Sequence, residues 1–150
     1  MSDYEFTMSL RVQHPRIDPT EITRALGIRP QHTWRAGEPR RDPAGVSLEG
    51  THRDSYWVAS LMAEPQLAAA HIDVESEMLR AATQLRRSSD FLQSLADQGG
   101  AAQIEVSLFA REDFRLELSP DLLLLFGRLG LTVIFDVQPH PKSTDPIVPL

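Results

Sequence analysis

The first 27 residues predict a strand followed by a short capped helix. Hydrophobic and polar side chains alternate from Tyr4 to Val12, a pattern typical of a strand with one buried face and one exposed face. Asp18 then offers a carboxylate to the free amides of a helix, Pro19 suits the first helical position, and Gly27 suits a left-handed stop. Because a helix this short is unstable alone, we expect tertiary packing to hold it.

The spacing of hydrophobic residues predicts the remaining elements. A long helix is expected from Val74 to Leu85, and Ser88 or Ser89 is expected to cap a second piece that stops at Gly99-Gly100. The other expected elements are a short strand at Thr33–Ala36, an interior strand at Ser55–Met62, a strand at Ile104–Ala110, its hairpin partner at Phe114–Leu118, a helix from Ser119-Pro120 to Gly130, and a last buried strand at Leu131–Val137.

This order of elements predicts an α+β fold, with an antiparallel or mixed sheet and helices packed on one face. The strand, capped helix and Leu-Gly stop of residues 4–28 are echoed by residues 103–131. Two explanations of this similarity are open. It reflects either a duplicated β-α-β unit, arranged in the ferredoxin-like manner, or a chance similarity of two capped helices. We expect one domain over residues 1–138 and a loose proline-rich tail over residues 139–150.

Composition limits the classes of function. The chain has no cysteine, which excludes disulfides, thiolate metal sites and cysteine nucleophiles. Its net charge of −6 argues against a nucleic-acid backbone as the main partner. The first residues show no secretory signal, and the longest apolar run, Leu122–Phe126, is too short to span a bilayer. We therefore expect a cytoplasmic protein with no membrane partner.

Several of these residues also form a recognisable pattern. The first strand precedes Asp18-Pro19-x-x-Ile22-x-x-x-Leu26-Gly27-Ile28-x-Pro30, and Gly37 and then Trp57 within a strand follow. Together with Leu118-Ser119-Pro120, Leu129-Gly130 and Asp136, this pattern resembles the bacterial family catalogued as domain of unknown function 4279, over about residues 4–137. The resemblance implies a small bacterial α+β domain with no assigned activity. It assigns structural positions only: Gly27, Pro30, Gly37, Trp57 and Gly130.

One loop gathers the candidate binding residues, which are His32, Trp34, Arg35, Arg40 and Arg41. Guanidinium groups beside an indole could hold a carboxylate, a phosphate or an acidic protein surface, or could stack on a base. The alternative is that Trp34 folds into the edge of the core while the arginines are solvated. Core packing is the favoured interpretation of Trp57.

No catalytic or metal-binding constellation is recognisable. The histidines show no metal spacing and are expected in loops or at the surface: His14, His32, His52, His71 and His140. No nucleophile motif or phosphate-binding glycine loop is present, so we expect no enzyme, no cofactor and no metal. The favoured hypothesis is a non-enzymatic protein-interaction module, of unknown oligomeric state and in its narrower form immunity-protein-like. The alternative is a regulatory domain that binds a small anionic ligand.

Overall fold

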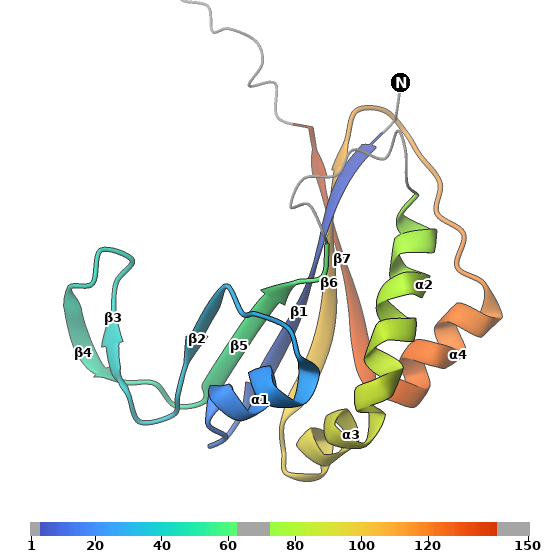
Figure 1. Cartoon of the computed structure of the whole chain (residues 1–150). Coiled ribbons are helices and arrows are strands. Elements are labelled where there is room, and N and C mark those ends of the chain that lie inside the picture. Colours follow the sequence, from blue (N-terminus) through green and yellow to red (C-terminus); the bar gives the residue numbers. More distant parts are fainter. Residues whose placement is uncertain (1–3, 63–72, 141–150) are drawn as a thin grey trace, which may run out of the picture.

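The computed structural model describes residues 4–62 and 73–140, and Figure 1 shows the arrangement of the elements. The elements in chain order are β1 (Tyr4–His14), α1 (Pro19–Leu26), β2 (His32–Trp34), β3 (Pro39–Arg41), β4 (Ser47–Thr51), β5 (Ser55–Ser60), α2 (Val74–Leu85), the 3-10 turn η1 (Arg86–Ser88), α3 (Ser89–Asp97), β6 (Ala101–Ala110), α4 (Pro120–Leu129) and β7 (Leu131–Pro139).

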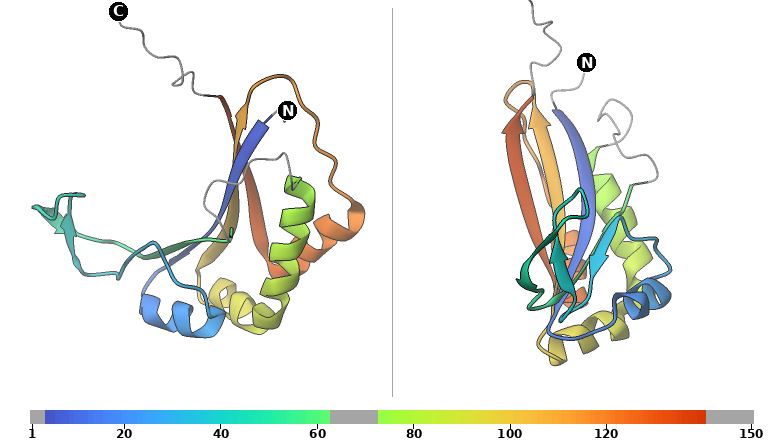
Figure 2. Two further views of the ribbon diagram at one scale, coloured as in Figure 1. Left: turned by 45° about the horizontal axis from the view of Figure 1, so that its top comes forward. Right: turned by 90° about the vertical axis from the view of Figure 1, so that its left-hand side faces the viewer.

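Five strands form one mixed sheet in the order β2-β5-β1-β6-β7. The pairs β2–β5, β5–β1 and β1–β6 are antiparallel, whereas β6–β7 is parallel. The helices cover one face of this sheet, and we call the opposite face the open face (Figures 1 and 2). The structure therefore confirms the α+β fold with a mixed sheet and helices on one face.

The first four strands of the sheet have the ferredoxin-like β-α-β-β-α-β connectivity. One crossover is β1-α1-β2, and the other runs from β5 through α2 and α3 to β6. Residues 103–131, whose order of strand, capped helix and Leu-Gly resembles that of residues 4–28, form a different unit, β6-α4-β7. Its two strands are adjacent and parallel, whereas β5 separates β1 from β2. The similarity of the two capped helices therefore does not identify the second ferredoxin-like unit.

The hairpin predicted for Phe114–Leu118 is wrong. This segment has no strand structure, because β1 and β7 already pair with the two sides of β6. Its alternating side chains Phe114, Leu116 and Leu118 instead pack, half-buried, against the core. The expectation that Leu131–Val137 is a buried strand is also wrong, because β7 is an edge strand and Val137 is 55% exposed.

The core lies between the sheet and the helices. Alternate residues of β1 point into it, and α2 contributes the buried stripe Val74, Met78, Ala81, Ala82 and Leu85. α1 is capped by Asp18, whose Oδ1 accepts a hydrogen bond from the Thr20 amide at 3.0 Å, and it ends at Gly27 with φ of 68°.

The expected domain boundary differs by one residue from the end of the last strand. β7 runs through Pro139, and residues 141–150 of the expected tail lie outside the described residues.

The cap of α2 provides a first prediction. Oδ1 of Asp73 accepts a hydrogen bond from the Ser76 amide at 2.7 Å, and hydrogen bonds from the side chain and backbone of Ser76 lower the pKa of Asp73 below its ordinary 3.8. Asp73→Ala should lower the free energy of unfolding by about 1 kcal/mol at neutral pH. The measurement is urea denaturation followed by far-UV circular dichroism.

The charge of Asp73 can be separated from its capping bond with Asp73→Asn, since asparagine also caps helices well. A carboxyl with a lowered folded-state pKa stabilises the protein above its unfolded-state pKa and loses this effect as pH falls through the folded-state value. The advantage of wild type over Asp73→Asn should therefore shrink as pH falls below about 3.8. An advantage that grows on acidification would contradict this assignment.

Candidate functional site

Four aromatic side chains gather on the open face near the β2 edge. Trp34 of β2 pairs with Tyr56 of β5, and their rings stack with centroids 4.6 Å apart. The His52 ring, just before β5, stacks on Trp34 at 4.3 Å and 14°. The His32 ring meets Trp34 edge-on at 5.2 Å. We call these four residues the aromatic stack.

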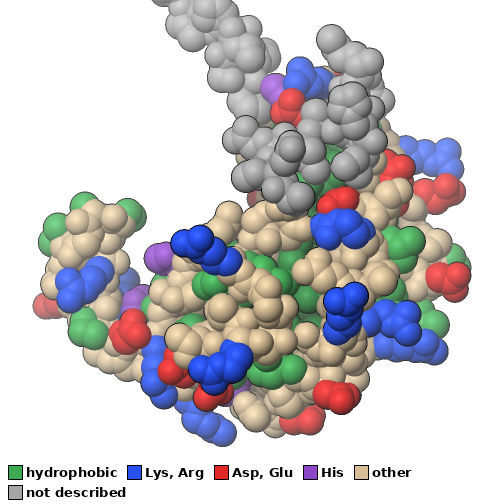
Figure 3. Space-filling model, viewed as in Figure 1, with side chains coloured by type: hydrophobic (Ala, Val, Ile, Leu, Met, Phe, Trp, Pro, Cys, Tyr) green, Lys and Arg blue, Asp and Glu red, His purple; other side chains and the backbone are tan. Residues whose placement is uncertain are grey.

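Beside the aromatic stack, β3 and β4 form a two-stranded arm that projects from the body of the protein (Figure 1). Figure 3 shows this arm standing apart, with hydrophobic side chains at its surface. Every residue of β3 and β4 is exposed, and Val46 and Leu48 are 59% and 43% exposed. A two-stranded hairpin of this kind is at best marginally stable in water without something to pack against.

Hydrogen bonds close the base of the arm and connect the residue before it to the body of the protein. The Gly37 amide donates to the His52 carbonyl at 2.8 Å, and the His52 amide donates to the Glu38 carbonyl at 2.9 Å. The buried Ser55 hydroxyl accepts from the Ala36 amide at 2.9 Å and donates to the Ile17 carbonyl at 2.6 Å. The Ser55 bonds and the aromatic stack therefore join the residues that flank the arm to the body of the protein.

The arginines of the predicted site do not converge on Trp34. Nη1 of Arg35 lies 3.5 Å from Oδ2 of Asp18, at the start of α1. Nη1 of Arg41 donates to the Gly45 carbonyl at the tip of the arm at 3.3 Å, and Arg40 is exposed on β3. Of the five predicted site residues, the structure therefore brings only His32 and Trp34 into contact.

Trp34 does not belong to the core formed by the described residues. It is half-buried on the open face, and two stacked neighbours occupy much of its ring surface. The sequence reasoning missed His52 and Tyr56 as its partners. A signal for Tyr56 was available, because Tyr56 and Trp57 are adjacent on one strand and must face opposite sides, so a core position of Trp57 leaves Tyr56 on the face away from the core.

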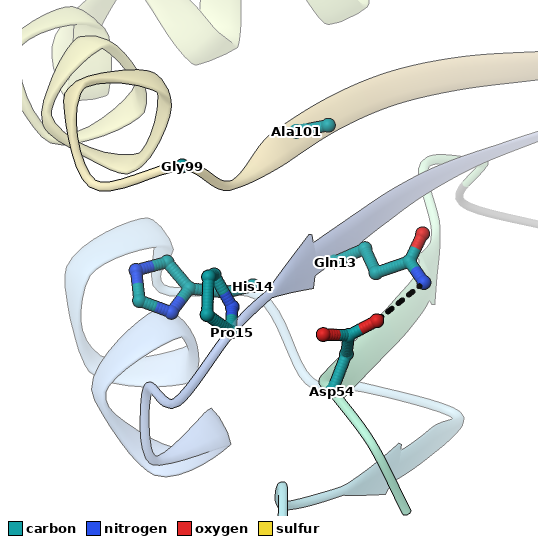
Figure 4. A pocket seen from close by; sticks show the side chains of 6 residues that line it. All are labelled: Gln13, His14, Pro15, Asp54, Gly99 and Ala101. Atoms are coloured by element: carbon teal, nitrogen blue, oxygen red, sulfur yellow. Dashed lines mark hydrogen bonds between the residues drawn. The ribbon is translucent and has the colours of Figure 1, made fainter.

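A small hollow lies where β1 ends (Figure 4), with a volume of about 240 Å³. It is lined by Gln13, His14, Pro15, Asp54, Gly99 and Ala101. Nε2 of Gln13 donates to Oδ2 of Asp54 at 3.4 Å, on the opposite side of the hollow from the His14 ring. With a carboxylate and no guanidinium in its lining, this hollow is poorly suited to an anion.

His14 is not at the surface, which corrects the expectation for the histidines as a group. It is only 2% exposed, and its Nδ1 accepts hydrogen bonds from the amides of Arg16 and Ile17. Within residues 4–62 and 73–140, no three His, Cys, Asp or Glu side chains are grouped so that they could hold a metal ion. None of the helices in these ranges has the length and apolar character needed to cross a bilayer.

Comparison with known proteins identifies the family. Residues 4–140 match the family described as Domain of unknown function (DUF4279). No curated protein and no solved structure matches the chain. The match covers 137 of the 150 residues, counted from residue 4 to residue 140, and it includes every strand and helix described above. The chain belongs to the DUF4279 family.

Proposed function

We propose that this chain is a non-enzymatic protein-interaction module of a bacterial cytoplasmic protein, and that its β3–β4 arm is the binding element. The single observation that carries the proposal is an exposed hairpin, with Val46 and Leu48 in solvent, next to the aromatic stack. Burying these side chains on a partner would stabilise both the hairpin and the complex.

The arm carries charges of both signs, with two arginines on β3, Asp42 directly after it and Glu49 on β4. Arg40 and Arg41 are neighbours on β3, and both are exposed. An apolar patch that receives Val46 and Leu48, bordered by carboxylates near these arginines, would fit the arm. In the immunity-protein-like form of the proposal, residues 42–150, which hold sixteen acidic and eight basic side chains, would add contacts to a basic region of a toxin.

The small-anion alternative has weaker support. Arg35 contacts Asp18 and Arg41 contacts the Gly45 carbonyl, so these two arginines do not converge, and the hollow at the end of β1 contains the Asp54 carboxylate. A thermal-shift screen with phosphate, sulfate and carboxylate metabolites tests this alternative. A saturable shift that Arg40→Ala and Arg41→Ala abolish would favour it over the protein-interaction module.

The test of the arm is affinity capture followed by measurement with the purified partner. Three proteins are used as baits in lysate of the native organism: wild type, the double variant Val46→Ser/Leu48→Ser, and the control Leu79→Ser. Leu79 is also exposed but lies on α2, away from the arm. A protein retained by wild type and Leu79→Ser, but lost by the arm variant, is then titrated against all three. We expect the arm variant to bind at least tenfold more weakly.

An equal affinity of the three baits for the purified partner would contradict the arm as the binding element. The genes beside the coding gene give an independent check of the immunity-like form. A toxin gene immediately upstream supports this form, and exclusively metabolic neighbours count against it.

A further inference from the structure

The outer edge of β7 is a feature of the sheet that the proposed function does not use. β7 is nine residues long and forms the margin of the sheet, as the right-hand view of Figure 2 shows. Its outer side pairs with no strand in the described part of the chain. A long edge strand presents unpaired amides and carbonyls that form a template for another strand.

The composition of β7 makes it a favourable strand for pairing. Its sequence, Leu-Thr-Val-Ile-Phe-Asp-Val-Gln-Pro, is rich in β-branched and aromatic residues and contains one charge, Asp136. Natural edge strands usually avoid pairing through lysines, bulges or internal prolines. β7 has no lysine, its only proline is the last residue, and its register with β6 is continuous.

Two apolar side chains of β7, the exposed Val137 and the half-buried Ile134, are not among those packed against the core. Val137 is 55% exposed. Ile134 pairs with Glu105 on the open face, where its strand neighbours Thr132 and Asp136 are polar. The core accounts for Val133 and Phe135, which pack against it, but not for Ile134 and Val137.

We propose that the outer edge of β7 binds the β7 of a second copy of this chain, antiparallel and about a two-fold axis at Ile134. This register places Ile134 opposite its own counterpart, and Val137 opposite the partner copy's Leu131. It places Thr132 opposite Asp136, so that no two like charges face each other across the axis. An edge strand paired antiparallel with its own copy makes an isologous contact in which each donor meets an acceptor.

Helix α4 supplies a second feature of the same interface. Leu122, Phe126 and Leu129 of α4 are buried against the core. The side of α4 toward α2 lines a separate hollow. Leu123, which is 53% exposed, lies on the remaining side, together with Gly127. α4 packs on β7, the edge strand, and on α2, so the side of α4 away from α2 faces in the direction of the outer edge of β7.

Gly127 is unexplained by the packing of one copy. A methyl group at this position would meet nothing within 4 Å, although glycine in a helix costs about 1 kcal/mol relative to alanine. A smooth helix surface beside Leu123 leaves room for the α4 of the second copy, because close helix packing needs interaxial distances of about 8–10 Å.

The first experiment measures the mass of the full chain in solution by analytical ultracentrifugation over a range of concentrations. We expect wild type to sediment as a species of twice the 16.8 kDa chain mass. Ile134→Lys should be monomeric, because it places two like charges opposite each other on the axis. Within one copy the new lysine would lie beside Glu105, which favours retention of the fold.

Thr132→Lys is the matched control. It adds the same charge to the same strand and face, but in the proposed register it lies opposite the partner copy's Asp136, so it should stay dimeric. A monomeric wild type at all concentrations would overturn the proposal. A dimer that survives Ile134→Lys unchanged, or one that Thr132→Lys disrupts equally, would overturn the register.

Single-cysteine variants test the register even if a lysine variant fails to fold. The chain has no cysteine, so any disulfide must come from the introduced residue. Opposite residues of antiparallel strands have Cα atoms about 4.5–5.5 Å apart, within disulfide range. Ile134→Cys should therefore form a covalent dimer on mild oxidation. Thr132→Cys should not, because the two copies of residue 132 would lie about 14 Å apart along the strands. Equal cross-linking of both variants, or of neither, would overturn the proposal.

Discussion

Replacing Trp57 by alanine should lower the free energy of unfolding by about 3–5 kcal/mol, the range for removing a buried tryptophan. Trp57 is completely buried in the middle of β5, and its register partners are Val12 of β1 and Thr33 of β2. Its Nε1 donates to the Thr23 hydroxyl on α1 at 3.0 Å. Alanine would therefore leave a cavity in the sheet and remove the bond that joins α1 to it.

The other tryptophan of the chain is the control. Trp34 sits on the same sheet but is half-buried on the open face, so Trp34→Ala should cost less than about 2 kcal/mol. Urea denaturation followed by far-UV circular dichroism measures both, since each substitution removes one of the two fluorescent tryptophans. If Trp57→Ala cost no more than Trp34→Ala, the assignment of Trp57 to the centre of the core would be wrong.

Trp57→Phe separates the two contributions at this position. Phenylalanine keeps most of the buried ring but cannot donate to Thr23, so we expect a loss of about 1–2 kcal/mol. Thr23→Val tests the same bond from α1 and should give a similar loss. A loss with Trp57→Phe as large as that with Trp57→Ala would mean that the hydrogen bond dominates over packing.

Features set by neighbouring residues could be predicted from the sequence. The cap at Asp18 depends on amides two residues away, and the left-handed stops at Gly27 and Gly130 depend on backbone freedom at one residue. The alternation in β1 and β6 likewise reports which face of each strand is apolar. None of these patterns requires knowledge of which strands are neighbours.

The order of the strands in the sheet could not be predicted from the sequence. Alternation at Phe114, Leu116 and Leu118 showed that one side of the segment is apolar, and the hairpin was inferred because a turn precedes it. The segment does contact the core. However, the edge of β6 can pair with one further strand only, and β7, which follows α4, takes that place. The alternating segment therefore covers the core without joining the sheet.

The candidate site shows the same limit. Trp34 and its loop could be selected from the sequence, but the partners of Trp34 depend on β2 lying beside β5. That pairing brings Tyr56, 22 positions along the chain, into contact with Trp34. His14 was missed for a related reason, since a single histidine at the end of a strand has no pattern that distinguishes a buried ring from an exposed one.

The second large effect is expected at His14. Its Nδ1 accepts from the amides of Arg16 and Ile17 at 3.0 and 2.9 Å, so the ring proton must sit on Nε2. Nε2 then donates to Oε1 of Gln98 at 2.8 Å. Through these bonds the buried ring joins the end of β1, the turn before α1 and the end of α3.

Gly100 shows how tightly this ring is packed. A Cβ atom at residue 100 would lie 2.9 Å from Cδ2 of His14 and 2.9 Å from the Leu95 carbonyl oxygen. The glycine therefore provides the space that the imidazole fills, and its amide donates to that same carbonyl at 2.8 Å. A smaller residue at position 14 would leave a void that this hydrogen-bonded turn cannot easily close.

His14→Ala should lower the free energy of unfolding by about 3 kcal/mol. It leaves the Arg16 and Ile17 amides without an acceptor, which costs about 1–3 kcal/mol for each amide that water cannot reach, and it creates a cavity. His14→Asn should lose about half as much, since an asparagine oxygen can accept from the amide two residues on. His32→Ala, at an exposed histidine whose ring meets Trp34 edge-on, is the control and should cost about 1 kcal/mol or less. If His14→Ala and His32→Ala lowered the free energy of unfolding equally, His14 would behave as a surface residue. The ring of His14 would then not join these three segments.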